Sequence, residues 1–582
     1  MNKSWADYFE KSFLAHVYLG HFNWDLIKDF PSQEKGDEAI GDRMCREVVA
    51  FIDENLDDAA LLREGKLPAA FLAAVKKTPY PKLVCKKSLG GAELSNINVF
   101  RILQRAFDRN IPAALAMSMS NSFGVAALLP AYGEGDFKDF VTKRVTEGIL
   151  SGWADTEPAG AANWLPMTKA ISGDGGQTFE ITGEKCYIGN GSVADVLLVS
   201  TTIEQDGKKP DCFLFAVDTT SKGFSVRKNH DFMGIAGAPI AALRFDRVKV
   251  DRRQLLETTE KHWRDTFLIE PLSALGRMFT VVAVTTAISK KCLQDMLSFQ
   301  EQRIIDSRKL KTYKKIEALV TKTAAEIFAL DSVVEWCLLG SDGSDLPNRW
   351  WEQTAAKNIA SLAATRIADR AISLLGASGY ERAESKKRLG LNEYPTERYY
   401  RDARAFRISG GVDFLIDHQA SHRWLTSFFF NENFDHKARF ADLRELSPIP
   451  RLDPDLSEEN LRHLLALNQA TKDLGEIIQD VVSRFGIEEL REMQPVIILF
   501  NRIANEIFTM SVTIARAKRL AKSTDSKMGR LAEEYCFEGV LKLEVLFSKL
   551  KSELGLVESK SSRREDVANL VKTHPKTFSI LT

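Results

Sequence analysis

The sequence predicts a mainly α-helical protein with a small antiparallel β-barrel or sandwich lodged between helical domains. Apolar residues recur at three- and four-residue spacing before residue 145 and again from Glu270 to Ser427, which is the period of amphipathic helices. From Gly152 to Arg252 the chain switches to short β-rich runs separated by Gly- and Asp-containing turns. A Pro-containing linker at 446–454 then leads into further amphipathic helices. We therefore expect an N-terminal helical domain at 1–145, a β domain at 146–255, a four-helix bundle at 256–435 and a helical extension at 436–582.

The composition is that of a large globular protein without a strong electrostatic preference. A chain of 582 residues with 44% apolar residues can bury a large core. Its 79 basic and 79 acidic residues cancel, so the sequence does not carry the basic footprint of a nucleic-acid-binding protein. Seven cysteines, an odd number without CxxC spacing, favour reduced thiols. With no signal-peptide pattern and no apolar run of about 18 residues or more, we expect a cytoplasmic protein.

Each domain contains elements that the sequence pattern delimits. In the first domain we expect helices at 69–76, 100–107 and 113–129, with a loop through Tyr80 and Gly91. The expected strands are 179–181, 196–202, 212–218, 224–227 and 243–250. The expected bundle helices are 271–299, 312–340, 350–375 and 400–428, with a Gly-rich loop at 376–379. The expected helices of the extension are 457–484, 488–523 and 528–553.

Three segments carry motifs of one known family. Tyr394–Ile416 reads YPTERYYRDARAFRISGGVDFLI, and its first half resembles the acyl-CoA dehydrogenase pattern in which Tyr-Pro-x-Glu-Arg leads into Arg-Asp-Ala-Arg. Thr156–Pro158, followed by 159–163, resembles the family's TEP-x-x-GSD segment. Lys185–Gly191 resembles its K-x-[WY]-I-T-N-G segment. The helical extension is similar to that of the very-long-chain branch, so the resemblance covers nearly the whole chain.

The resemblance implies FAD as cofactor, an acyl thioester such as acyl-CoA as substrate and an electron-transfer acceptor as partner. In the family, the two segments of the β domain lie against the flavin, where glycines allow close backbone approach and hydroxyls supply edge hydrogen bonds. Carried over residue by residue, the implied cofactor contacts are Thr156, Ala162, Tyr187, Gly189, Arg303, Ser373 and Ala377. Arg277 is the implied substrate contact.

The residue that the family uses as its catalytic base is missing. The reaction needs a carboxylate to remove the α-proton of the thioester, and a buried one suits the task because desolvation raises its pKa. The family's Glu corresponds here to Gly410, and the alternative position used by a minority of members corresponds to Gly276. Asp413, three residues beyond Gly410, is a candidate replacement, and its competing role is to cap the helix that begins at Phe414. Glu270, which opens the bundle, is a further carboxylate near this region.

The cofactor contacts are also reduced relative to the family. Hydroxyl positions of the family correspond to Ala162 and Gly189, and its Gln corresponds to Ser373. The Arg-x-x-Phe-Gly motif keeps Arg303, but Asp306-Ser307 replaces Phe-Gly. Each lost neutral hydrogen bond weakens binding by about 0.5–1.5 kcal/mol, so we expect weakened FAD binding.

Other polar residues of the motif region have structural interpretations. Glu397 and Asp402 are expected to pair with Arg398 and Arg401. His418 and His422 have the spacing of a metal-binding pair on a helix, but no third ligand accompanies them, so a structural role is expected.

Three functions stay open at this point. The first is an FAD-dependent oxidoreductase of acyl thioesters, expected as a homodimer. The second is a flavoenzyme with different chemistry, and the third is a non-catalytic homologue that acts as a binding or partner subunit in a heteromer. A bound flavin separates the first two from the third. The extension also implies contact with a membrane surface in some members of the branch, but its polar faces mix acidic and basic residues, which disfavours that role here.

Overall fold

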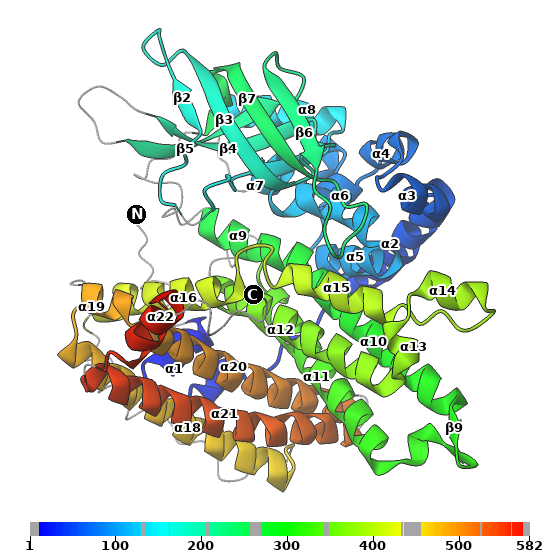
Figure 1. Cartoon of the computed structure of the whole chain (residues 1–582), viewed down its shortest axis with the longest axis vertical. Coiled ribbons are helices and arrows are strands. Elements are labelled where there is room, and N and C mark those ends of the chain that lie inside the picture. Colours follow the sequence, from blue (N-terminus) through cyan, green and yellow to red (C-terminus); the bar gives the residue numbers. More distant parts are fainter. Residues whose placement is uncertain are drawn as a thin grey trace. The chain divides into compact units, whose positions relative to one another are not determined.

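The computed structural model describes the chain in two compact units (Figure 1). The large unit is Asp29–Asp413, and the small unit joins Met1–Lys28 to Phe414–Thr582. The mainly helical fold with one β domain is confirmed, while the four finer domain boundaries stay a prediction. The described residues are 11–129, 135–161, 163–203, 210–256, 269–342, 349–431, 435, 455–523, 526–559 and 561–573.

The large unit begins with a group of helices. They are α2 Lys35–Asn55, α3 Asp58–Glu64, α4 Ala69–Lys76, α5 Asn96–Arg109, α6 Ile111–Ser122, α7 Val125–Leu128 and α8 Asp136–Glu147. Helix α4 has the predicted bounds. The prediction of one helix over 113–129 is wrong, because the chain breaks at Gly124. A Cβ there would lie 2.1 Å from Ser151 Oγ and 2.9 Å from Ser120 Cα, so only glycine allows this close approach to the first strand.

An eight-stranded sheet follows. Its strands are β1 Ser151–Ala154, β2 Lys169–Ile171, β3 Thr178–Gly189, β4 Val196–Ile203, β5 Asp211–Asp218, β6 Phe224–Asn229, β7 Ile240–Asp251 and β8 Leu255–Leu256. The order is β6-β7-β3-β2-β4-β5-β8, with β1 beside β4. Both β1 and β2 run parallel to β4, so the predicted purely antiparallel arrangement is wrong, although all five predicted runs fall within observed strands.

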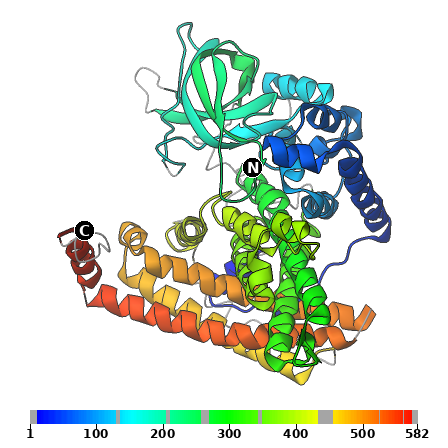
Figure 2. The same ribbon diagram turned by 45° about the vertical axis from the view of Figure 1, so that its right-hand side comes forward.

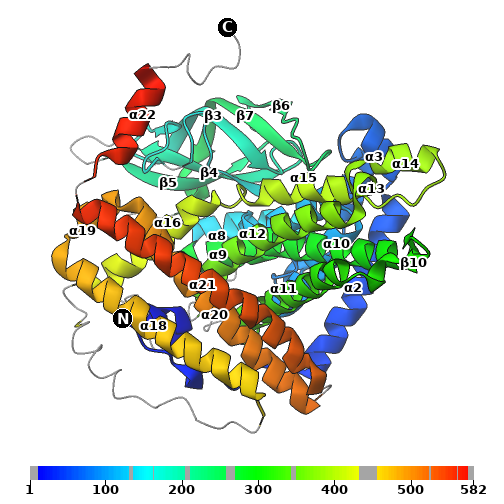
Figure 3. The same ribbon diagram turned by 60° about the horizontal axis from the view of Figure 1, so that its bottom comes forward.

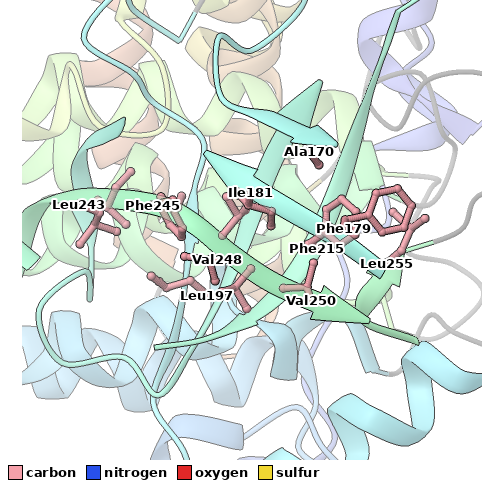
Figure 4. Close-up of a cluster of buried hydrophobic side chains, with 14 of the residues drawn as sticks. Ala170, Phe179, Ile181, Leu197, Phe215, Leu243, Phe245, Val248, Val250 and Leu255 are labelled. Carbon is pink, nitrogen blue, oxygen red and sulfur yellow. The ribbon is translucent and has the colours of Figure 1, made fainter. Parts of the chain in front are cut away.

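The core of the β domain is formed by alternate strand residues (Figure 4). Phe179 and Phe215 pack edge to face with ring centroids 5.1 Å apart. Strand β4 is buried along its whole length, since Leu197 belongs to this core while Leu198 packs into a second cluster with α7 and α8. This double burial explains why β4 reads as a continuous apolar run rather than an alternating one.

The bundle completes the large unit. It contains α9 Ile269–Arg277, a π-helical turn Met278–Val282, α10 Ala283–Gln302, α11 Lys314–Leu338, α12 Trp350–Leu375, α13 Ala377–Tyr380, α14 Ala383–Arg388 and α15 Thr396–Phe406. The hairpin β9 Ile304–Ile305 and β10 Arg308–Lys309 follows α10. The prediction of one helix over 400–428 is wrong. Gly410 and Gly411 have φ of +69° and +105°, which ends the helix and forms a turn.

The small unit is helical. It contains α1 Phe13–Tyr18, α18 Glu458–Arg484, α19 Ile487–Glu492, α20 Gln494–Ser523, α21 Gly529–Glu558 and α22 Arg563–Thr573, and α16 Asp413–Trp424 leads into it. Figures 2 and 3 show α18, α20 and α21 side by side, and α1 packs on α18 and α20. The predicted helix 488–523 is divided, because α19 ends before α20 begins.

Within the described ranges, three helical segments are long and apolar enough, by length and composition, to cross a membrane. They are Ile111–Leu128, Pro271–Gln302 and Gln494–Lys522. Between 83% and 89% of each apolar window is buried inside the protein, so the protein core accounts for their apolar character.

Candidate functional site

A β-bulge in β3 joins the two segments of the β domain that resemble family motifs. The register between β3 and β7 shifts between Lys185 and Ile188, which takes Cys186 and Tyr187 out of the ladder. The Cys186 N–H donates instead to the Thr156 carbonyl at 2.9 Å. The bulge therefore fixes the Thr156 segment beside β3.

A buried ion pair holds the same two segments together. Lys185 Nζ lies 2.9 Å from Glu157 Oε1, and their side chains are 0% and 3% exposed. The Glu157 carboxylate also accepts the N–H groups of Met167 and Thr168 at 2.6 and 2.8 Å. Burial would raise the pKa of Glu157, but the charge of Lys185 and these hydrogen bonds hold it below its ordinary value. Because both charges are paired and hydrogen-bonded, the pair is a structural anchor of the site.

The bulge presents an exposed aromatic ring. Tyr187 is 59% exposed and has φ of +59°, a left-handed conformation rare for a residue with a Cβ. Its backbone N–H donates to His230 Nε2 at 3.1 Å, and the two rings stack at 4.4 Å. The interpretation of Tyr187 as a ring contact stays a prediction.

The neighbouring positions of the motif contribute backbone and packing. A Cβ on Gly189 would lie 2.6 Å from Met119 Sδ, so a larger residue here requires Met119 to move. Asn190 is fully buried and donates to the carbonyls of Ala116 and Ser151 at 2.9 and 3.0 Å. The Asn190 Nδ2 amide group thus fixes the loop to α6 and β1.

The remaining predicted cofactor residues lie at the other end of the large unit. Arg303 is exposed at the end of α10, Ser373 is exposed and donates to the Asp369 carbonyl at 3.1 Å, and Ala377 is exposed at the start of α13. In Figure 1, β9 and α13 lie at the end of the bundle away from β3. The elements that carry or border these residues therefore lie apart from β3, the strand that contains Tyr187. Ala162 lies outside the described residues.

The two positions of the family base have different surroundings. The Gly410 carbonyl accepts from Arg277 Nε at 2.9 Å, and a Cβ on Gly410 would lie 3.4 Å from Arg277 Cγ and from Val281 Cγ2. A Cβ on Gly276 would lie 2.5 Å from the Ser122 carbonyl oxygen. A side chain at 276 therefore collides with backbone, whereas one at 410 meets only side chains.

The turn 407–413 is held by donors from the bundle. Lys357, which is 0% exposed, donates to the carbonyls of Arg407 and Gly411 at 3.1 and 2.5 Å. Asn358 donates to the Asp413 carbonyl at 2.7 Å. The sequence prediction missed Lys357, and the available signal was a single lysine within a run of small and apolar residues in α12.

Asp413, the sequence candidate for a replacement base, is paired within this turn. Asp413 is 5% exposed. Its carboxylate accepts a hydrogen bond from Arg407 Nε at 2.8 Å, and Arg407 Nη2 lies 2.6 Å from the same carboxylate oxygen. A carboxylate held in this way is a weaker proton acceptor than a desolvated, unpaired one. It is also the first residue of α16, so the ion pair adds to a favourable position at the helix start.

Other polar candidates have structural partners. Glu397 pairs with Arg401 at 2.8 Å as predicted, but Asp402 accepts the N–H of Ile235 at 2.5 Å rather than an arginine hydrogen bond. The rings of His418 and His422 stack at 5.9 Å, and the described ranges contain no group of three metal-ligating side chains. The Glu270 side chain is outside the described part of the chain.

Comparisons with known proteins show similarity to one family. The model of the acyl-CoA dehydrogenase middle domain matches residues 152–248, and the model of its C-terminal domain matches residues 274–415. The chain therefore carries segments that match both the middle and the C-terminal domain of acyl-CoA dehydrogenases. The probable acyl-CoA dehydrogenase FadE10 of Mycobacterium tuberculosis is 25% identical over 93% of this chain and 86% of that protein. The very long-chain specific acyl-CoA dehydrogenase of rat mitochondria is 22% identical over 70% of this chain and 61% of that protein.

Solved structures extend the family likeness to the whole fold. An acyl-CoA dehydrogenase from Bacillus anthracis, complexed with FAD, has a TM-score of 0.77 and 18% identity and covers 96% of this chain and 94% of its own. Butyryl-CoA dehydrogenase from Megasphaera elsdenii has a TM-score of 0.55 and 20% identity and covers 67% of this chain and 97% of its own. The likeness to the first includes the helical extension, as the sequence resemblance implied.

Proposed function

We propose that this acyl-CoA dehydrogenase homologue is an FAD-dependent oxidoreductase that acts on an acyl thioester. The observation that carries the proposal is the β3 bulge. It anchors the Thr156 segment through Cys186 and leaves the Tyr187 ring exposed, in the two segments that match the family's flavin contacts. Close backbone approach beside an exposed aromatic face is what a flat ring requires of a protein.

The donor set fits FAD in part. In this proposal Thr156 and Tyr187 hold the ring, and Arg303 supplies a positive charge to the adenosine side. Gly189 offers backbone only, and Ser373 is shorter than the family's Gln. When bound, FAD supplies the acceptor for the β-hydride of the thioester. The protein residues bind and orient the ring, and we expect them to do so more weakly than in members with the full set of hydroxyls.

The proton-removal step lacks a residue placed for it at either family position. Gly410 and Gly276 have no side chain, and the Asp413 carboxylate is paired with Arg407. General-base catalysis contributes about 10²–10⁴-fold. Wild-type turnover of saturated acyl-CoAs should therefore be lower, by about this factor, than that of homologues with the catalytic Glu. The second candidate function is that of a binding subunit in a larger complex. Low turnover agrees with that function as well. CarC of Acetobacterium woodii, 22% identical over 66% of this chain, is a subunit of a caffeyl-CoA reductase-Etf complex.

An absorbance titration tests the proposal directly. Purified protein is dialysed against FAD, and the bound flavin is measured at several free concentrations. We expect saturable binding of FAD with weak retention on dialysis, and saturated acyl-CoAs reducing the bound flavin slowly. Protein that takes up no flavin at saturating FAD but retains acyl-CoA would support the binding-subunit function instead.

We further propose a homodimer formed through the end of the bundle. Several large apolar side chains are exposed in β9, in α13 and around the end of α14, namely Ile304 at 62%, Tyr380 at 80%, Leu389 at 68% and Leu391 at 56%. Exposed apolar surface of this kind marks association sites. In the family, a subunit reaches the adenosine part of its neighbour's FAD at this end. A stable monomer in light scattering at low protein concentration would contradict the dimer.

The partner and the compartment follow from the same family assignment. We propose an electron-transfer acceptor that reoxidises the flavin, and a cytoplasmic location. All seven cysteines are free in the structure, which agrees with a reducing compartment.

A further inference from the structure

The loop that carries His230 is fixed at its far side to the bundle. It connects β6 to β7, and Arg401 of α15 donates to the Met233 carbonyl at 2.6 Å. The N–H of Ile235 donates to the Asp402 carboxylate at 2.5 Å. Both α15 residues belong to the Arg-Asp-Ala-Arg motif, so the motif holds a loop of the β domain against α15 through these two hydrogen bonds.

A second contact leaves the loop little freedom. A Cβ on Gly234 would lie 2.5 Å from the Arg401 carbonyl oxygen, so loop and helix backbones are in direct contact. At the near side, the N–H of His230 donates to the Ile240 carbonyl at 2.8 Å and extends the β6–β7 ladder. His230 therefore projects from a segment whose two sides are both fixed.

Tyr187 needs such a support, because its own surroundings do not explain its conformation. A left-handed backbone is strained for a residue with a Cβ such as tyrosine, and a ring that is 59% exposed recovers little by burial. The bulge has removed the Tyr187 N–H from the ladder, and His230 Nε2 is its acceptor. The imidazole also stacks on the phenol ring with planes 29° apart, and Phe232 packs 5.6 Å from the imidazole.

We propose that His230 is a positioning residue, whose neutral imidazole holds the exposed Tyr187 ring ready to receive a planar ligand. The identity of that ligand, the flavin ring of FAD, rests on the proposed function. The positioning itself rests on the hydrogen bond, the stack and the loop held against α15.

The hydrogen bond fixes the protonation state of His230. A backbone N–H can only donate, so Nε2 must present its lone pair and the ring must carry its proton on Nδ1. Protonation of Nε2 would set two N–H groups against each other and release Tyr187. Burial lowers the pKa of His230, and Lys228 on its own segment lowers it further. Tyr187 faces it from β3, the Ile240 backbone from β7, and Arg401 and Asp402 of α15 bind the loop backbone.

A titration without cofactor tests the contact. The chain has 11 tyrosines, so protein labelled with nitrogen-15 tyrosine gives few amide signals, and Tyr187→Phe identifies the signal of Tyr187. We expect the chemical shift of the Tyr187 amide to change with a single protonation, that of His230, as pH falls. His230→Phe should abolish this change. His418→Phe, the same change in the small unit, should leave the response intact. The proposal would be overturned if the Tyr187 amide signal did not change with pH in the wild type, or if it changed equally in His230→Phe.

A FAD titration provides the second readout. His230→Phe keeps an aromatic stack but removes the acceptor, and the loss of one hydrogen bond should weaken FAD binding about 5- to 10-fold. His230→Gln retains an acceptor and should recover part of the affinity. Unchanged affinity in His230→Phe would contradict positioning for FAD. If wild-type protein binds no FAD at all, the proposed function fails, whereas the amide titration still decides whether His230 positions Tyr187.

Discussion

The β3 bulge and the turn 407–413 are both departures from regular structure, and they differ in what they leave available. At the bulge, backbone groups bind neighbouring segments while the Tyr187 ring stays exposed. In the turn, Lys357 and Arg277 donate hydrogen bonds to backbone carbonyls, and the Asp413 carboxylate is paired with Arg407. The chain thus keeps a surface on which a ring can lie and has rebuilt the segment that supplies the base in other family members.

The largest expected effect comes from returning a carboxylate to the turn. With FAD bound, Gly410→Glu should raise oxidation of a saturated acyl-CoA by about 10²–10⁴-fold, because the missing step is general-base catalysis. The substitution costs about 1–2 kcal/mol at φ of +69° and meets only the side chains of Arg277 and Val281. Flavin bleaching in a stopped-flow assay with acyl-CoA measures the gain.

Gly276→Glu is the matched control, since its side chain would collide with the Ser122 carbonyl. It should lower stability without creating activity. Asp413→Ala in the same assay checks the competing base. If wild-type turnover is already high and Asp413→Ala abolishes it, then the base is Asp413 and the contrast between bulge and turn disappears.

The next effect tests whether the bulge depends on its anchor. Lys185→Met leaves the buried Glu157 carboxylate without its charge partner and should lower the free energy of unfolding by about 3–5 kcal/mol. Lys249→Met is the control on the same sheet, because Lys249 is 81% exposed and lies 3.8 Å from Glu180. That change should stay within about 0.5 kcal/mol in urea unfolding. Equal losses in both variants would show that the Glu157 pair is not an anchor.

A smaller effect is expected in the turn. Lys357→Met removes the donors to two carbonyls and should lower stability by about 1–3 kcal/mol. Hydrogen exchange should locate the loss at residues 407–413, with the exchange of β3 unchanged. Faster exchange spread over both regions would mean that turn and bulge are not independent.

The sequence predicted the order of elements and the family motifs because both depend on local periodicity and short spacing. It failed where the outcome depends on contacts between distant residues. The Asp402 carboxylate binds a backbone group 167 residues away, and nothing in the motif indicates that partner. The predicted helix 400–428 runs through Gly410-Gly411 because the apolar period continues on both sides of them, whereas the capping role considered for Asp413 already implies a helix start beside Phe414. Thr156 and Tyr187 are proposed from the resemblance alone, since a β-bulge has no signal in the periodicity.

The smallest effect concerns pH and the helix that leads into the turn. Asp295 of α10 accepts a weak 3.4 Å hydrogen bond from Thr396 at the start of α15, and burial raises its pKa from the ordinary 3.8 to about 6. The folded state therefore binds this proton more tightly than the unfolded state. The stabilising contribution is complete below the ordinary value and is lost as pH rises through about 6.

Asp295→Asn removes the titrating group, so the variant should gain stability relative to wild type as pH rises through this window, by about 1–2 kcal/mol after allowance for partial exposure. Urea unfolding of both proteins across the window measures the difference. Asp174→Asn is the control with the opposite sign, because hydrogen bonds from Thr178 hold the pKa of that exposed carboxyl below its ordinary value. A parallel pH dependence of wild type and Asp295→Asn would show that Asp295 stays ionised in the folded protein, and that α15 enters the turn without help from this carboxyl.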